Sequence, residues 1–189
     1  MILNIFGPSG SGKTTFVRDL LQSNKTHQFF EEFTDNKSQG ILNGKISISL
    51  IPLPLFRGTI AEYFMIFSID IYELLDLNSQ LRDLAESIFG KIVDNHSLLN
   101  FSKRNVETFS AGEMRRLFIL KSLIIKESIT IIDEPFSNSD EKLWNIIYSA
   151  LQTVPRTIIL SHLSLEKSIV SDDQHKSIHI EEVKLKFKI

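Results

Sequence analysis

Eight consecutive residues near the start of the chain have the composition of a loop that binds polyphosphate. They read Gly7-Pro8-Ser9-Gly10-Ser11-Gly12-Lys13-Thr14, match Gly-x-x-x-x-Gly-Lys-[Ser/Thr] at every fixed position, and are followed by Thr15. Their backbone N–H groups and the N-terminus of the next helix supply many donors in a small space. Lys13 would place its charge on the β- and γ-phosphate oxygens, and the Thr14 hydroxyl would complete a Mg²⁺ shell. We therefore predict that Gly7 to Thr15 bind a nucleotide; the simpler alternative is a glycine-rich turn that caps a helix.

Two acids follow an apolar run in the second half of the chain. Ile129–Ile132 leads directly into Asp133, Glu134 and Pro135. Ligands of a parallel sheet lie beyond the carboxyl ends of its strands, so both acids are expected to face the phosphates. Asp133 would hold Mg²⁺, directly or through water, and Glu134 would polarise a water for in-line attack on the γ-phosphoryl group. Taken alone, the same residues would serve equally well as a cap of the next helix.

Positioning these groups requires strands that end at them. Apolar runs predict buried strands at Ile2–Phe6, Ile129–Ile132 and Thr157–Leu160, and alternation with Ser47 and Ser49 predicts a half-buried strand at Ile46, Ile48 and Leu50. Helices are predicted at Thr14–Gln22, Ser110–Lys126 and Trp144–Leu151. The middle helix is amphipathic, with leucines and Ile124 facing inward and Glu113, Arg115 and Lys121 facing outward. Strands that alternate with helices imply an α/β fold with a parallel sheet flanked by helices.

Two further segments complete the expected architecture. From Thr59 to about Leu99 the apolar spacing is helical, which predicts an inserted helical subdomain at approximately residues 57–108. The alternation in Ile178–Ile180 and Val183–Ile189 predicts a closing C-terminal β-hairpin. We found no repeat or linker, so residues 1–189 are predicted to be a single ATP-binding domain.

The composition excludes several classes of protein. The net charge of −2 offers no electrostatic case for nucleic acid as a partner, and the absence of cysteine rules out disulfides and thiolate metal sites. No stretch has the roughly 18 consecutive apolar residues of a membrane span, and the first residues run straight into the glycine-rich loop. We expect a cytoplasmic protein whose association with a membrane depends on a partner.

Six segments resemble the ATP-binding cassette (ABC) family in the order in which that family carries them. Beside the phosphate loop and the acids, Phe109-Ser110-Ala111-Gly112-Glu113 resembles the signature Leu-Ser-Gly-Gly-Gln. Ser137-Asn138-Ser139-Asp140 is similar to the D-loop, Ile158–His162 resembles the strand that ends in the switch histidine, and Phe56–Glu62 is similar to the segment that opens the helical subdomain. Each is weak alone, because Ser110 and Glu113 would also make a helix capping box and His162 would suit an ordinary strand end.

The resemblance implies a P-loop NTPase that hydrolyses MgATP as a head-to-tail dimer of identical or different subunits. Ser110, Ala111 and Gly112 of one copy would close over the γ-phosphate held by Lys13 of the other. His162 would hold the γ-phosphate and the water in cis, while Ser139 and Asp140 would lie in the loop that links the two sites. The family also implies a separate integral-membrane permease, which would place this chain on the cytoplasmic face of the cell membrane.

The chain departs from the family at three places. Leu53 or a neighbouring proline stands where the family has a glutamine that reaches Mg²⁺, which predicts slow hydrolysis. The aromatic residue on which adenine stacks in the family is expected to lack a counterpart, because only Met1–Phe6 precede the loop. The signature carries Phe109, Ala111 and Glu113 in place of Leu, Gly and Gln.

Three other functions stay open on the sequence. A small nucleoside or nucleotide kinase would suit the glycine-rich loop, although the stretch from Thr59 to Asn105 holds only Arg82 and Arg104 for a lid. An ABC-type ATPase acting on DNA or ribosomes would be expected to carry coiled-coil insertions or paired cassettes. A regulatory cassette that binds ATP without turning it over would be compatible with Leu53.

Overall fold

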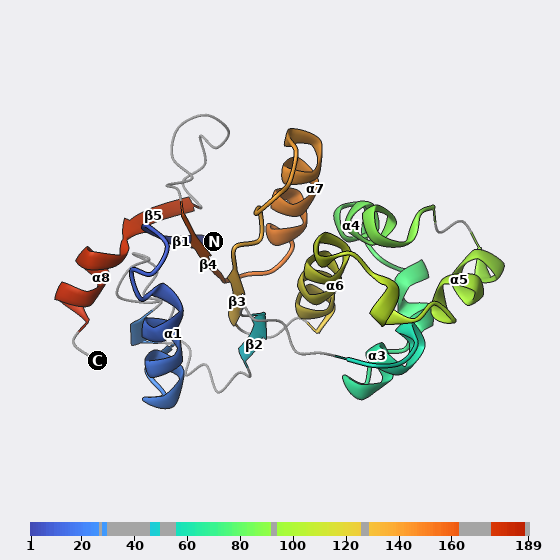
Figure 1. Cartoon of the computed structure of the whole chain (residues 1–189), viewed down its shortest axis with the longest axis horizontal. Helices are drawn as coiled ribbons and strands as arrows, with labels where there is room; N and C mark the ends of the chain where they lie inside the picture. Colours follow the sequence, from blue (N-terminus) through green and yellow to red (C-terminus); the bar gives the residue numbers. More distant parts are fainter. Residues whose placement is uncertain are drawn as a thin grey trace. The chain divides into compact units, whose positions relative to one another are not determined.

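A computed structural model describes residues 1–26, 28–29, 46–49, 56–91, 94–125, 129–162 and 175–187. The chain divides into two compact units (Figure 1). The first, here called the sheet unit, takes the N-terminal residues, the segment around Asp133 and the residues from Val154 onward. The second, the helical unit, takes the residues between these segments. It reaches beyond residues 57–108, because it includes the two helices that flank the segment around Asp133.

The described strands of the sheet unit form one parallel sheet in the order β2-β3-β4-β1-β5. Their bounds are β1 Ile2–Phe6, β2 Ile46–Ser49, β3 Ile129–Asp133, β4 Thr157–Ser161 and β5 His175–His179. Every neighbouring pair runs parallel, which confirms the predicted α/β class. Parallel neighbours end at the same edge, so the loops that follow β3, β4 and β1 emerge side by side.

Helices α1 (Lys13–Gln22) and α8 (Ile180–Lys186) belong to the same core as the sheet. Apolar residues of β1, β3 and β4 alternate toward this core, and Phe16, Val17 and Leu20 of α1 pack against them. Ile180 and Val183 of α8 join the same cluster. The loop between β1 and α1 is therefore anchored at both of its ends by buried elements.

The predicted C-terminal β-hairpin is wrong. His175–His179 is a single strand that pairs with β1, and the chain then turns directly into α8. Glu181 and Glu182 lie in the first turn of α8, while Lys184 and Lys186 lie in its last turn, which complements the helix dipole at both ends. These charges and the helical spacing of Ile180 and Val183 favour a helix here, where a hairpin would need a second strand.

Strand β2 forms as predicted, but its serines lie inside. Ser47 and Ser49 are buried, whereas Ile48 is 38% exposed. The strand lies at the edge of the described sheet, where apolar side chains gain less cover than in the centre. Leu50 lies outside the described residues.

The helical unit contains five α-helices and two short 3₁₀ helices within the described residues. Their bounds are α3 Ile60–Ile66, η1 Ile71–Leu75, α4 Ser79–Phe89, α5 Asn95–Ser102, η2 Val106–Thr108, α6 Ala111–Ile124 and α7 Glu141–Leu151. Each α-helix begins after a residue whose side-chain oxygen accepts a backbone N–H of the first turn: Thr59, Asn78, Asp94, Ser110 and Asp140. Such caps define where each helix starts.

Helix α6 is more deeply buried than its sequence pattern predicted. Leu117, Leu120 and Leu123 face inward as expected, but Lys121 is buried too, which corrects its predicted outward position. Its ammonium lies 4.7 Å from the centre of the Phe67 ring, and burial lowers the pKa of this lysine. The attraction between a cation and an aromatic ring offsets part of the cost of removing the ammonium from water. The helix therefore tolerates a charge on its buried face.

We expect Tyr63→Phe to raise the stability of the protein. Tyr63 packs edge-on against four aromatic rings, and within the described residues its buried hydroxyl has no hydrogen-bond partner. Burial accordingly raises the pKa of this phenol. Removing an unsatisfied buried hydroxyl should increase the free energy of unfolding by about 1 kcal/mol, measured by denaturant titration. Tyr63→Leu, which loses the ring contacts, is the control and should be destabilised. A loss of stability in Tyr63→Phe would mean that the buried hydroxyl makes a stabilising hydrogen bond.

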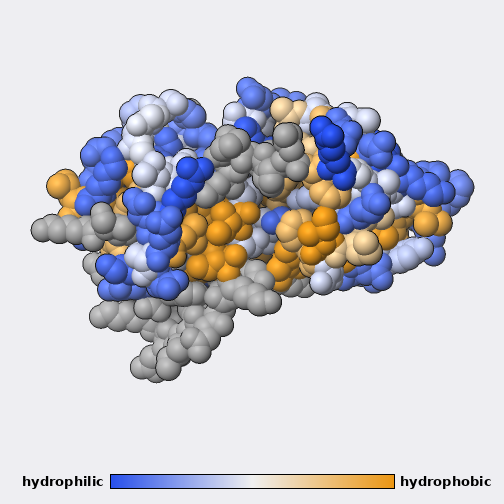
Figure 2. All heavy atoms as spheres, turned by 60° about the horizontal axis from the view of Figure 1, so that its bottom comes forward, coloured by the Kyte–Doolittle hydropathy of each residue, from blue (hydrophilic) through white to orange (hydrophobic). Residues whose placement is uncertain are grey.

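Hydrophobic side chains reach the surface on the face shown in Figure 2. In the helical unit the most exposed large ones are Met65 and Ile66, at 70% and 62% exposure, at the end of α3. Among the described residues no helix is both long and apolar enough to cross a membrane.

Candidate nucleotide site

The loop after β1 has the backbone conformation of a phosphate cradle. Gly10 and Gly12 have φ angles of 77° and 86°, in the left-handed region that glycine adopts without strain. Gly12 is the N-cap residue of α1, so the N-terminus of this helix opens on the loop. The Lys13 ammonium is buried and donates to the carbonyl oxygens of Gly7 at 2.7 Å and Pro8 at 3.1 Å. The lysine thus lies across the loop, where a bound phosphate would meet its charge.

The sheet places the other predicted residues beside this loop. Strand β4 lies between β1 and β3, and the residues that follow β1 and β3 donate hydrogen bonds to the last residues of β4. The N–H of Gly7 donates to the carbonyl of Ser161, and the N–H of Glu134 donates to the carbonyl of Leu160. Glu134 and His162, which follow β3 and β4, therefore lie next to the glycine-rich loop.

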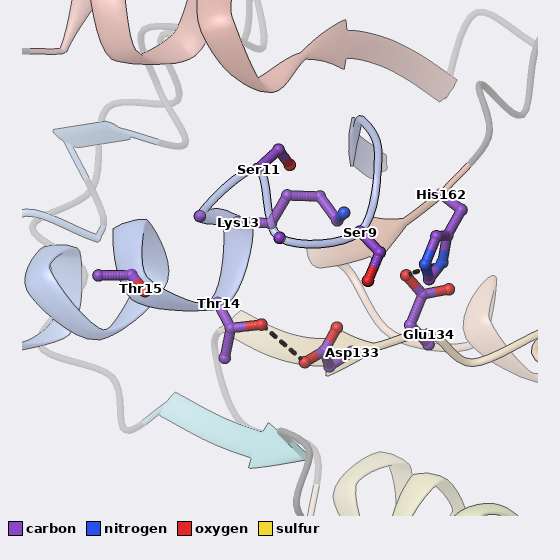
Figure 3. A pocket seen from close by; sticks show the side chains of 10 residues that line it. Ser9, Ser11, Lys13, Thr14, Thr15, Asp133, Glu134 and His162 are labelled. Carbon is purple, nitrogen blue, oxygen red and sulfur yellow. Dashed lines mark hydrogen bonds and ion pairs between the residues drawn. The ribbon is translucent and has the colours of Figure 1, made fainter.

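Thr14 and Asp133 form the first pair at the site. The Thr14 hydroxyl donates to Asp133 Oδ2 at 3.0 Å (Figure 3). Two adjacent oxygen ligands of one Mg²⁺ lie about 3 Å apart, because each metal–oxygen bond is about 2.1 Å long. Within the described residues no group of three or more His, Cys, Asp or Glu could hold a metal, so a cation here would need further oxygens from phosphate or water. One hydroxyl and one carboxylate fit the way Mg²⁺ is held beside a nucleotide.

Glu134 and His162 form the second pair. His162 Nδ1 lies 2.5 Å from Glu134 Oε1, and their side chains face each other in Figure 3. Because a carboxylate only accepts hydrogen bonds, the imidazole donates through Nδ1. Glu134 has a φ angle of 50°, a left-handed conformation that costs a non-glycine residue on the order of 1 kcal/mol. The fold therefore holds this carboxylate in a strained position, as is common for residues of functional sites.

These residues line one cavity of ≈ 370 Å³ in the sheet unit. Its lining consists of the predicted nucleotide, metal and catalytic residues, except Gly7 and Pro8: Ser9, Gly10, Ser11, Gly12, Lys13, Thr14, Thr15, Asp133, Glu134 and His162. Segments from three different parts of the sequence thus meet in a space suited to a polyphosphate.

The signature-like residues lie at the N-terminus of α6. The Ser110 hydroxyl accepts the N–H of Glu113 at 3.2 Å, and the Glu113 carboxylate accepts the N–H of Ser110 at 2.9 Å, which is a capping box. The bond from the Ser110 N–H, followed by the Ser110 hydroxyl and Arg104, lowers the pKa of Glu113. Ser110, Ala111 and Gly112 are exposed. Among the described residues, a Cβ added to Gly112 would approach only the Arg116 side chain, at 3.4 Å, so this part of the chain leaves the small residue uncovered.

The remaining predicted residues lie in the turn before α7 or outside the described residues. Asp140 caps α7 by accepting the N–H of Leu143 at 2.8 Å, and the N–H of Ser139 donates to the carbonyl of Phe136. Leu53, the residue aligned with the glutamine of the family, lies outside the described residues.

One residue at the loop was missed by sequence reasoning. The Lys184 ammonium of α8 donates to the carbonyl oxygen of Ser11 at 2.7 Å, across 173 residues of sequence. No sequence motif predicts this contact, because a lysine in the last turn of a helix ordinarily faces water. Only the parallel pairing of β5 with β1 brings α8 to the loop.

Comparisons with known proteins agree with this arrangement. The family model described as ABC transporter matches residues 1–137. The spermidine/putrescine import ATP-binding protein PotA of Mesoplasma florum is 25% identical over 94% of this chain and 48% of its own length. The zinc import ATP-binding protein ZnuC of Ehrlichia ruminantium is 27% identical over 85% of this chain and 61% of its own length. The chain thus spans about half to three fifths of these relatives.

Solved structures share the fold. A crystal structure of an archaeal ribosome recycling factor, aABCE1, in complex with the ribosomal stalk protein aP1 matches with a TM-score of 0.57 and 19% sequence identity. The match covers 85% of this chain and 28% of that one. At this identity the likeness concerns the fold alone.

Proposed function

Since this chain belongs to the ABC transporter family, we propose that it is the ATP-binding and ATP-hydrolysing subunit of a transporter whose membrane-spanning part is a separate chain. The observation that carries the proposal is the single cavity in which the glycine-rich loop, Asp133, Glu134 and His162 meet. The relatives PotA and ZnuC are named as ATP-binding proteins of import systems, and both match most of this chain. The predicted organisation as one ATP-binding domain with an inserted helical subdomain is part of the proposal.

The nucleotide is bound by Gly7 to Thr15. Backbone N–H groups of the loop and the N-terminus of α1 surround the β-phosphate, and Lys13 moves its ammonium from the Gly7 and Pro8 carbonyls to phosphate oxygens. Mg²⁺ is held by the Thr14 hydroxyl and, directly or through water, by Asp133. When bound, this cation neutralises phosphate charge.

Hydrolysis depends on Glu134 and His162. Glu134 accepts a proton from the attacking water as the water's oxygen bonds to the γ-phosphorus and the bond to the β–γ bridging oxygen breaks. His162 keeps the carboxylate in place through the contact at Nδ1, which leaves its other ring nitrogen for the γ-phosphate. The prediction that Leu53 makes this reaction slow stays a prediction.

A second subunit completes the site. Ser110, Ala111 and Gly112 would approach the γ-phosphate bound by the other copy, whether identical or different in sequence, and Asp140 would lie in the linking turn. The proposal is supported by the exposure of these three residues at the N-terminus of a 14-residue helix and by the uncovered Gly112. A helix N-terminus stabilises an anion through its free N–H groups and its dipole.

A membrane protein is the proposed partner of the helical unit. Met65 and Ile66 expose apolar surface at the end of α3, which suits a protein contact better than water. Through this partner the chain would lie on the cytoplasmic face of the cell membrane. The net charge of −2 provides no attraction to nucleic acid.

The purified full-length chain should hydrolyse ATP only when Mg²⁺ is present. We expect phosphate release to stop when the metal is chelated with EDTA and to return when Mg²⁺ is added, because Thr14 and Asp133 need the cation to hold the triphosphate. The measurement is phosphate release, with and without a co-purified membrane partner. Transfer of the γ-phosphoryl group to a nucleoside or nucleotide would instead identify a kinase. Binding of MgATP without turnover, even with the partner, would identify a regulatory cassette.

A further inference from the structure

Helix α8 contacts the glycine-rich loop at both of its ends. Just before the loop, the ring of His179, which ends β5 and caps α8, packs edge-on against Phe6, the last residue of β1, with 5.2 Å between ring centres. A Cβ added to Gly7 would lie only 2.7 Å from the Ile180 side chain. At the far end, Lys184 donates to the Ser11 carbonyl at 2.7 Å. The segment that follows β5 is therefore fitted to the outer side of the loop, opposite the cavity residues Asp133 and Glu134 (Figure 3).

Lys184 is bonded both to the loop and to its own helix. Its other contact in the described residues is Glu181 Oε1 at 3.1 Å, one turn earlier on the same helix. Both side chains of that pair are well exposed, at 40% and 61%, and exposed ion pairs contribute little. The Lys184 ammonium and its neighbouring carbon would also lie 3.5 Å and 3.7 Å from a Cβ on Gly12. The side chain thus covers the peptide that joins Ser11 to Gly12.

That peptide has a fixed relation to the nucleotide site. A trans peptide is planar, and its C=O and N–H groups point in opposite directions. The Ser11 carbonyl points toward α8, so the N–H of Gly12 points away from α8 and toward the cavity. Gly12 allows the peptide to turn easily, because glycine populates both positive and negative φ. A loop of this composition needs a contact that keeps the N–H groups aimed at the phosphates.

We propose that Lys184 is a positioning residue of the nucleotide site, which holds the Ser11–Gly12 peptide with its N–H directed at the bound phosphates. This inference rests on the proposed function, because it assigns the residue a role in binding ATP. Lys184 acts through the backbone of the loop and does not touch the nucleotide. The C-terminal helix that takes the place of the expected hairpin is thereby part of the binding site.

The chain provides a matched control for this proposal in Lys186. Lys186 lies on the same helix, and like Lys184 it pairs with an acid one turn earlier, Glu182 at 3.0 Å. Lys184→Met and Lys186→Met both remove one positive charge and an exposed ion pair with an acid of the same helix. Only the first removes the hydrogen bond to Ser11.

The test compares the two variants in the full-length protein by nucleotide affinity, thermal unfolding without nucleotide, and amide hydrogen exchange in the loop. We expect Lys184→Met to weaken MgADP and MgATP binding about tenfold, the effect of one charge-assisted hydrogen bond. Lys186→Met should change either affinity less than twofold. Exchange of the Gly12 amide in the nucleotide-free protein should be faster in Lys184→Met than in Lys186→Met. Lys184→Arg retains a donor for the Ser11 carbonyl and should restore most of the affinity.

Two results would overturn the proposal. Equal weakening by both methionine variants would mean that the charge of α8 attracts the nucleotide generally. A lower unfolding temperature for Lys184→Met with unchanged affinity and unchanged Gly12 exchange would mean that the lysine only fastens α8. If the wild type bound no nucleotide, the proposed function would fail, while the exchange of the Gly12 amide would still decide whether Lys184 fixes the peptide.

Discussion

Glu134→Gln is expected to lower the rate of ATP hydrolysis by about 10²- to 10⁴-fold, the usual contribution of a general base. The amide has nearly the shape of the carboxylate but takes no proton from the attacking water. Affinity for MgATP should stay close to that of the wild type, because Glu134 follows β3 beyond the Thr14–Asp133 pair and makes no contact with the loop lysine. Single-turnover hydrolysis and equilibrium nucleotide binding measure the two quantities separately.

Glu134→Gln also tests whether two copies of the chain form a dimer around the nucleotide. With hydrolysis blocked, MgATP should hold two copies together, and light scattering should report a dimer that is absent without nucleotide. Adding Ala111→Arg should abolish this dimer, because a long charged side chain would occupy the exposed N-terminus of α6. This substitution leaves the capping box of Ser110 and Glu113 in place, so the helix keeps its start. Glu182→Gln, which neutralises an exposed acid outside the cavity, is the control and should hydrolyse ATP normally. A Glu134→Gln protein that hydrolyses at the wild-type rate would exclude this residue as the base.

The second large effect is expected from Lys13→Ala, which should reduce ATP affinity by about 30-fold to several thousandfold. Removing one partner of a buried, hydrogen-bonded charge pair costs about 2–5 kcal/mol, and 1.4 kcal/mol corresponds to tenfold. Isothermal titration with ATP and ADP gives the affinities. Unchanged affinity would remove the basis for assigning the loop to phosphate.

The structure adds a second consequence to this substitution. In the structure the Lys13 ammonium donates to the Gly7 and Pro8 carbonyls. Losing these bonds should lower the free energy of unfolding by about 1–3 kcal/mol. The affinity should therefore be measured at a temperature where denaturant titration shows the variant to be folded.

Features that depend on residues close together in the sequence were predicted well. The glycine-rich loop requires glycines and a lysine at fixed spacing, and β3 is recognisable from an apolar run that ends in two acids. Both therefore appear as contiguous patterns, and the parallel sheet then brings them together. The helix cap at Ser110 likewise depends on Glu113, three residues later.

Residues whose environment is made by distant segments were predicted poorly. Ile178-His179-Ile180 alternates like a strand, yet the helix begins at Ile180 because the following charges and Val183 favour it. Lys121 has the composition of a surface position, but the Phe67 ring from another helix faces it. Lys184 reaches the loop only through the pairing of β5 with β1. Local patterns contain no information on which distant segment will cover a given face.

The strand order has a consequence for how the protein is made. Strand β1, which precedes the glycine-rich loop, pairs only with β4 and β5 in the described sheet. It can therefore enter the sheet only after β4 and β5 have been synthesised. A ribosome adds about 5–20 residues per second, so roughly 8 to 35 seconds separate synthesis of the loop from synthesis of the strands that flank it. During that interval the apolar residues of β1 have no partner strands and stay exposed to solvent. Chaperones that bind exposed apolar segments would therefore have access to them. Under the proposed function, ATP would stabilise the newly made chain only after β5 had left the ribosome.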